Sequence, residues 1–182
     1  MILKIDDNLS LEMINALHAE PIFHLVNANR VHLREWLPWV TRMLTLEHFK
    51  EFIISSQQRY TDNCDHAFVI VLNEIVVGRI GVYNIDNQNK VGAIGYWLGE
   101  EYVGKNIVTS ACKTILNYCF EDLNLNRIEI RCATKNHKSQ AVAERLNFVK
   151  EGIVRQGEYL HNDYIDIYCF SMLKKEWLNT KS

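Results

Sequence analysis

The sequence predicts an α/β fold: a mixed, largely antiparallel sheet of about seven strands with helices on both faces. Three observations indicate it. The middle of the chain is rich in β-branched and aromatic residues, in runs at 67–72, 75–82 and 91–98. After residue 98, helical and strand patterns alternate. A helical pattern at 107–121 separates the 91–98 run from a strand at 127–133, as in a parallel crossover.

The first half supplies short strands and two helices. Residues 2–5 and 10–14 read as a first strand with an irregular continuation. Ala16 to about Asn29 is expected to be a helix, because Leu17, Ile22, Leu25 and Val26 share one face. An aromatic, mixed segment follows at 30–43. A second helix is expected from Thr45, a good N-cap residue, to Arg59.

The second half completes the sheet. Asn73 and Glu74 form a tight turn between two antiparallel strands. A helix at 138–146 and strands at 147–155 and 164–173 follow the 127–133 strand. Strands 91–98 and 127–133 should be parallel neighbours that splay apart at their carboxyl ends. Ligands of open sheets bind where neighbouring strands diverge.

Length and composition restrict the function. The 182 residues fit one domain, 1–182, and 48% hydrophobic residues are enough for a substantial core. A net charge of −2 is unlike that of a nucleic-acid binder. No apolar run reaches the roughly 18 residues of a membrane helix, and no secretory signal is evident. Five scattered cysteines predict reduced thiols in a cytoplasmic protein. Neither a metal-binding His/Cys cluster nor a GxSxG hydrolase motif is present.

The turn after the third central strand carries the clearest functional signal. The strand ends at Leu98, a turn runs from Gly99 through Gly104 to Asn106, and a helix begins near Ile107. A turn of this kind directs backbone N–H groups and the positive end of a helix dipole at one point. Such a point binds phosphate or pyrophosphate.

Two motifs then identify a family resemblance. The segment YWLGEEYVGKNIVTSA is followed by N-H-K-S at 136–139 and by LNF at 146–148. Together they resemble the acyl-coenzyme A-binding core of the GNAT acetyltransferase superfamily. Within it the chain is similar to the ribosomal-protein N-terminal acetyltransferase branch, the RimJ/RimL type. The segment LREWLPW at 33–39 and the late Gly157-Glu158-Tyr159 carry the branch resemblance.

The resemblance implies acetyl-CoA as cofactor, with no metal. The pyrophosphate would lie on the 104–109 turn, and Asn136 would hydrogen-bond the pantetheine arm. The family pattern is Gln or Arg, two residues, Gly, one residue, Gly or Ala. Val103, Asn106 and Val108 stand at these positions and depart from it. Asn106 can still adopt the left-handed conformation that glycine would supply. The cofactor-binding residues expected are Trp97, Leu98, Val103, Gly104, Lys105, Asn106, Ile107, Val108, Thr109, Asn136 and Ser139.

The expected catalytic residues come from three segments. Ser139 would protonate the leaving thiolate, and the backbone N–H of Leu98 would hold the oxyanion. Asp65 or His66 would act as the base, directly or through water. The resemblance favours Asp65, whereas the ordinary pKa of His66 suits the task better. Glu129 and Glu151 are further candidates. For Asn136 and Ser139, helix capping is the competing interpretation.

The acceptor is the part of the predicted reaction that the sequence specifies least. Trp36, Trp39 and Tyr159 are expected to line its cleft, although core packing is an equally good interpretation for one of the Trp residues. The prediction is direct acetyl transfer within a ternary complex to a primary amine, chiefly a protein N-terminus, such as that of a ribosomal protein. Two alternatives stay open: a small-molecule acetyltransferase for a polyamine, amino acid or antibiotic, and a non-catalytic acyl-CoA-binding module. A homodimer or higher oligomer is also expected, with neither nucleic acid nor membrane as partner.

Overall fold

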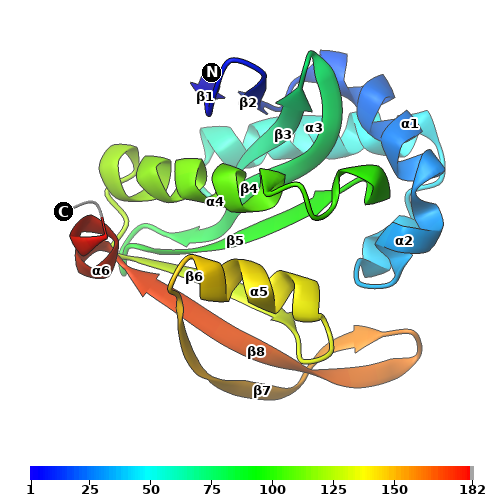
Figure 1. Cartoon of the computed structure of the whole chain (residues 1–182). Coiled ribbons are helices and arrows are strands. Elements are labelled where there is room, and N and C mark those ends of the chain that lie inside the picture. Colours follow the sequence, from blue (N-terminus) through cyan, green and yellow to red (C-terminus); the bar gives the residue numbers. More distant parts are fainter. Residues whose placement is uncertain (181–182) are drawn as a thin grey trace.

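The computed structural model describes residues 1–180 and arranges them around an eight-stranded sheet (Figure 1). The strand order is β1-β2-β3-β4-β5-β6-β8-β7. The pair β5–β6 is parallel and the others are antiparallel. The strands are β1 Ile2–Lys4, β2 Leu9–Met13, β3 His66–Leu72, β4 Ile75–Asp86, β5 Val91–Leu98, β6 Arg127–Ala133, β7 Val149–Leu160 and β8 Asp163–Leu173.

Six α-helices pack around this sheet. They are α1 Ala19–Ala28, α2 Arg30–Arg34, α3 Leu46–Thr61, α4 Ile107–Asn117, α5 His137–Arg145 and α6 Lys174–Asn179. Short 3-10 turns lie at Ala16–His18, Pro38–Thr41 and Glu100–Tyr102, and a π-helical turn, Tyr118–Asp122, continues α4. None of the helices in residues 1–180 is long and apolar enough to cross a membrane.

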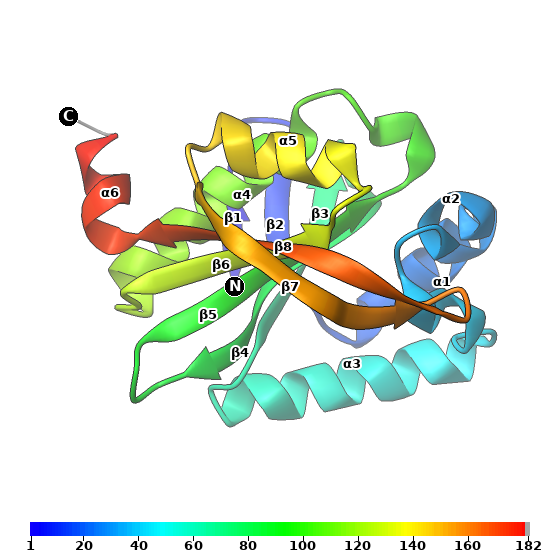
Figure 2. The same cartoon turned by 90° about the horizontal axis from the view of Figure 1, so that it is seen from below.

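The helices lie on opposite faces of the sheet, and each face has its own core. Figures 1 and 2 show α4 and α5 on one face and α3 on the other. Ile107, Ala111 and Ile115 of α4 pack in the first core with Val142 of α5. The second core contains buried residues of α1 and α3, namely Ile22, Val26, Phe49 and Ile53. We call the two sides the α4 face and the α3 face.

The splay expected at the centre of the sheet is present. The parallel pairing of β5 with β6 runs from Val91 opposite Arg127 to Ile94 opposite Ile130. Beyond it, Gly95–Leu98 continue alongside β4 only, while β6 continues to Ala133 alongside β8. The carboxyl ends of β5 and β6 therefore border a gap in the sheet.

Most predicted elements are found, with corrections at the ends. The bounds of β5 and β6 agree with the prediction, and Thr45 caps α3 in a capping box with His48. The sheet has eight strands because the N-terminal segment forms two, β1 and β2. Strand β4 extends to Asp86 rather than residue 82. Helix α6 was not predicted; Glu176 holds its first turn by accepting from the Leu173 N–H at 2.9 Å.

Candidate functional site

The turn before α4 has the conformation that an anion site needs. Gly104 has φ +83° and Asn106 has φ +61°, so both lie in the left-handed region. Asn106 thus takes the role that the family pattern gives to a glycine, at modest cost for an Asn. A side chain built on Gly104 would meet no atom within 4 Å, so this side of the turn is open.

Cations and unpaired donors converge on the same turn. The first N–H groups of α4 have no partner within the helix by geometry. Nη1 of Arg145, on α5, lies 3.4 Å from the Thr109 hydroxyl, and Lys105 lies over the Tyr102 ring. Backbone donors, a helix N-terminus and two basic side chains suit a pyrophosphate. Arg145 was missed from the sequence, because only the packing of α5 beside α4 brings it here.

The gap between β5 and β6 exposes main-chain donors. Backbone groups in an antiparallel pair point alternately toward and away from the partner strand. The Gly99 N–H donates to the Val77 carbonyl at 2.9 Å. The N–H of Trp97 therefore also points to β4, and that of Leu98 points the other way, into the gap. This orientation suits the oxyanion role expected of Leu98.

Ser139 faces the same gap from α5. Its hydroxyl lies 2.9 Å from the Tyr96 hydroxyl, and the Tyr96 hydroxyl donates to the Ser139 carbonyl at 3.2 Å. Asn136 caps α5, since its side chain accepts from the Ser139 N–H at 3.1 Å. Capping leaves the Asn136 amide N–H₂ available. Tyr96 was missed from the sequence; burial raises the pKa of its phenol, so it stays a neutral hydrogen-bond donor.

The structure does not bring Asp65 and His66 together with Ser139 and Leu98. They lie at the opposite end of the sheet, because His66 pairs with Val82 and Leu98 pairs with Gly78. Asp65 forms an ion pair with Arg59 and accepts from the Asn84 N–H at 2.8 Å. His66 is buried, with Nδ1 2.6 Å from the Tyr118 hydroxyl, and burial lowers its pKa although Asp65 opposes this.

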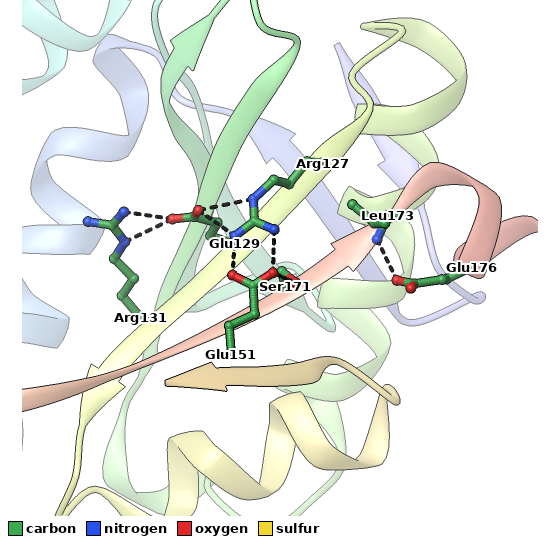
Figure 3. A network of polar contacts seen from close by, with 7 residues as sticks. All are labelled: Arg127, Glu129, Arg131, Glu151, Ser171, Leu173 and Glu176. Carbon is green, nitrogen blue, oxygen red and sulfur yellow. Dashed lines mark hydrogen bonds and ion pairs between the residues drawn. The ribbon is translucent and has the colours of Figure 1, made fainter. Parts of the chain in front are cut away.

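Glu129 and Glu151 are held in an ion-pair network (Figure 3). Arg127 bridges both carboxylates, at 2.8 Å to Glu129 and 2.6 Å to Glu151. Arg131 also binds Glu129, and the Ser171 hydroxyl donates to Glu151 at 2.8 Å. Arg127 and Ser171 lower the pKa of Glu151 to about 2. A carboxylate so stabilised is a poor proton acceptor at neutral pH.

The aromatic residues expected at the acceptor cleft, Trp36, Trp39 and Tyr159, lie in different parts of the structure. Trp39 packs beside Trp97, with ring centroids 6.0 Å apart, and both belong to the α3-face core. The backbone N–H of Trp97 pairs with β4 and its ring faces α3. This residue therefore lies on the side of the sheet opposite α4. Trp36 is half-buried next to Glu35. Tyr159 is exposed and lies against Tyr164, 5.1 Å between centroids.

Glu158 is a further candidate residue, which was not selected from the sequence. It lies on β7 opposite Ile165 of β8. Ile165 shares a face with Ile167, which lies opposite Ala133 where β6 ends. Glu158 therefore projects on the α3 face beside the gap, and Tyr159 projects on the other. Burial raises the pKa of Glu158.

The hairpin that carries Glu158 closes over this face. His161 at its tip donates from Nε2 to the Glu35 carbonyl at 3.2 Å. Figure 2 shows the tip of β7 and β8 beside α2. A pocket of about 490 Å³ lies there, lined by Val31, Arg34, Glu35, Thr41 and His161. In residues 1–180 we found no group of three or more His, Cys, Asp or Glu able to hold a metal ion.

Comparison with known proteins assigns the family. Residues 8–149 match the model of the acetyltransferase (GNAT) domain. The chain belongs to the GNAT acetyltransferase family. It is an acetyl-CoA-dependent N-acetyltransferase, and the fold and the RimJ/RimL-type resemblance predicted from the sequence are confirmed. The family match ends at the first residue of β7, Val149, so a single domain spanning 1–182 stays a prediction.

Three similar proteins are informative for this acetyltransferase. It is 33% identical to the putative ribosomal N-acetyltransferase YdaF of Bacillus subtilis, over 98% of both chains. It is 26% identical to the ribosomal-protein-serine acetyltransferase of Escherichia coli, over 94% of this chain and 96% of that one. A solved structure of the microcin C7 self-immunity acetyltransferase MccE, in complex with acetyl-CoA and AMP, superposes with a TM-score of 0.89 at 28% identity. That match covers 93% of this chain and 94% of the other.

Proposed function

We propose that the acceptor is the α-amino group at the N-terminus of a protein, of the ribosomal-protein kind. Two relatives that span nearly the whole chain are named as a putative ribosomal N-acetyltransferase and a ribosomal-protein-serine acetyltransferase, which supports a ribosomal protein as the kind of acceptor. An α-amino group, with a pKa of about 7.7–8.0, is partly neutral at physiological pH.

The residues of the α4 face suit the donor. The 104–109 turn and Arg145 would hold the pyrophosphate, and the main chain at the gap with Asn136 would hold the pantetheine arm. Acetyl-CoA, when bound there, supplies an activated acetyl group. The Leu98 N–H would stabilise negative charge on the acetyl oxygen. The Ser139 hydroxyl, oriented by Tyr96, would give its proton to the departing sulfur.

Glu158 is the base in this proposal, in place of Asp65 or His66. It lies across the gap from β5 on the face that the acceptor would approach, and its raised pKa makes it a better proton acceptor than an ordinary carboxylate. The placement of Glu158, Leu98 and Ser139 around one gap is the observation that supports the mechanism best. Trp36 and Trp39 would line the acceptor entrance.

An acceptor panel tests this function. Purified enzyme is given acetyl-CoA with N-terminal peptides, polyamines, amino acids and an amine antibiotic, and free thiol release is followed. We expect turnover with peptides that have a free α-amine, and none with the same peptides after N-terminal blocking. Turnover with polyamines alone would contradict the protein acceptor, and no turnover with any amine would support a binding module.

We further propose that the enzyme works in the cytoplasm as a homo-oligomer. All five cysteines are free thiols, which fits a reducing compartment. Strand β7 is the edge of the sheet and exposes Val149, Ile153 and Val154, a surface that a second copy could cover. Sedimentation equilibrium of the wild type and an Ile153→Lys variant tests this; a wild-type monomer would contradict it.

A further inference from the structure

Arg79 is a cation without a counter-ion on the α3 face. It lies in the middle of β4, opposite Trp97 of β5. None of the ion pairs among residues 1–180 includes it, and its Nε is buried without a hydrogen-bond partner. Its guanidinium instead lies over the ring of Phe52, 4.2 Å from the centroid, and 5.3 Å from that of Tyr83. Aromatic rings compensate only part of the lost hydration of a cation.

A second donor beside it also lacks a partner. Trp97 is 8% exposed, and its Nε1 is buried without a hydrogen bond among the described residues. Residues directly opposite in an antiparallel pair share a face, with Cβ atoms about 5 Å apart. Two residues with unsatisfied N–H donors, one of them charged, are therefore paired across β4 and β5 on the same face. Buried donors without partners are rare in native proteins, so a pair of them points to an oxygen ligand.

Two facing glycines shape the wall of this site. Gly81 and Gly95 pair across β4 and β5. A side chain at Gly81 would come within 2.7 Å of the Tyr83 hydroxyl, and one at Gly95 within 3.3 Å of its ring. The missing side chains let the Tyr83 ring lie along the sheet beside Arg79. The guanidinium is thereby framed by the rings of Phe52 and Tyr83.

The carboxylates of the same face do not neutralise Arg79. Asp65, which lies near Tyr83, is paired with Arg59. Glu129 is paired with Arg127 and Arg131. Glu158 lies on β7, four strands along the sheet order from β4. A carboxylate brought by a ligand would therefore find the positive charge of Arg79 available.

We propose that Arg79 and the Trp97 indole N–H bind a carboxylate of the acceptor. Trp97 immediately precedes Leu98, whose N–H faces the reacting group, so the carboxylate would lie within a few bonds of the amine. The favoured acceptor is thus an amine with a nearby carboxylate: a protein N-terminus with an acidic residue in its first positions, or an acidic amino acid. This inference rests on the proposed function. It adds that the favoured acceptor carries a negative charge close to its amine.

Matched acceptors test the inference without any mutation. Peptides with the N-terminal sequence Ser-Asp and Ser-Asn, otherwise identical, are compared by kcat/KM, with free aspartate as a third arm. A hydrogen-bonded charge pair predicts a preference of about 10- to 100-fold for Ser-Asp, mainly through KM. Equal kcat/KM for both peptides would overturn the carboxylate site and leave the proposed function standing. Turnover of aspartate without either peptide would support the carboxylate site and overturn the protein acceptor.

Variants then assign the preference to Arg79. Arg79→Met keeps an apolar stem over Phe52 and should remove the preference, while Arg79→Lys should keep part of it. Arg131→Met is the matched control, since it removes an already paired cation of the same face and should leave the preference intact. Peptide binding measured by calorimetry in the presence of coenzyme A should change in parallel. A preference that persists in Arg79→Met, or that disappears in Arg131→Met, would contradict the assignment.

Discussion

Ser139 is fixed in place by three contacts with two residues, and this defines its role at the residue scale. Its N–H is held by Asn136, its carbonyl accepts from Tyr96, and its hydroxyl lies 2.9 Å from the Tyr96 hydroxyl. Capping and catalysis were competing interpretations of the N-H-K-S segment. The structure shows that they are compatible, because the cap uses the backbone of Ser139 and leaves its hydroxyl at the gap.

Ser139→Ala should lower kcat by about 10²-fold, the low end for a positioned acid, because a thiolate leaves fairly well unaided. KM for acetyl-CoA should stay within about twofold, since the role exists only as charge develops. Steady-state kinetics measures both values. Tyr96→Phe is the companion variant and should reproduce part of the loss. A wild-type kcat in Ser139→Ala would remove the serine from the mechanism.

Glu158→Gln should lower kcat/KM by about 10²- to 10³-fold at pH 7 and less at pH 9, where the amine loses its proton unaided. In the wild type, kcat/KM should rise as pH passes the raised pKa of Glu158. A pH–rate profile of both proteins checks this. A pH-independent defect would contradict a role as base.

Although Glu158→Gln should lower activity, it should increase the stability of the folded protein. A carboxyl whose pKa is raised on folding favours the folded state below its ordinary pKa of about 4.3, and this contribution is lost as pH rises. Glu158→Gln should therefore raise Tm at pH 8 and leave it nearly unchanged at pH 4. Differential scanning calorimetry at the two pH values separates this from a general loss of structure.

At the scale of elements, His66 joins β3 to the end of α4. Its ring lies between Tyr118 and Tyr60, and its two nitrogens contact Tyr118 and Asn63. This arrangement assigns it a structural role in our mechanism. His66→Ala should lower the free energy of unfolding by about 1–3 kcal/mol, with kcat close to wild type at every pH. A pH-dependent fall in kcat would restore His66 as the base.

The lowered pKa of His66 also predicts a pH dependence of stability. Because burial resists protonation of the folded state, the unfolded state binds more protons as pH falls below about 6.5. The wild type should therefore lose more stability between pH 7.5 and 5.5 than His66→Ala does. Urea denaturation at the two pH values measures the difference.

Gly104→Val should weaken acetyl-CoA binding by about tenfold or more, because valine strongly disfavours the positive φ of this turn. Gly152→Val is the matched control: its side chain would also enter open space, and no positive φ is involved. Thermal shift with acetyl-CoA reports both. If acetyl-CoA raised the Tm of Gly104→Val and of the wild type equally, the pyrophosphate would have to bind elsewhere.

The sequence predicted the elements whose pattern is local. β5 and β6 have the predicted bounds because apolar runs end at clear turn residues, and the positive φ of Asn106 was anticipated from its residue type. The strand expected at 147–155 was predicted less well, since β7 runs from Val149 to Leu160. Its irregular pairing with β8 between Val154 and Glu158 depends on a bulge that no local pattern reveals.

At the scale of the molecule, the site has two halves that the sequence reveals unequally. The α4 half is a continuous motif followed by a second one, so its residues could be named. The α3 half comes from side chains far apart in the chain. Arg79 reads as a solvent-facing residue in an alternating strand until Phe52 of α3 covers it. Glu158 acquires its environment only when the β7–β8 hairpin reaches α2.

One measurement tests the central claim, that a protein α-amine is acetylated at the gap between β5 and β6. Wild type and Glu158→Gln are incubated with acetyl-CoA and a peptide carrying one free α-amine and one internal lysine, and mass spectrometry locates the acetyl group. We predict acetylation confined to the α-amine, matched one to one by thiol release, and strongly reduced in the variant at pH 7. Acetylation of the lysine alone, or an unmodified peptide beside an acetylated small amine, would contradict the account.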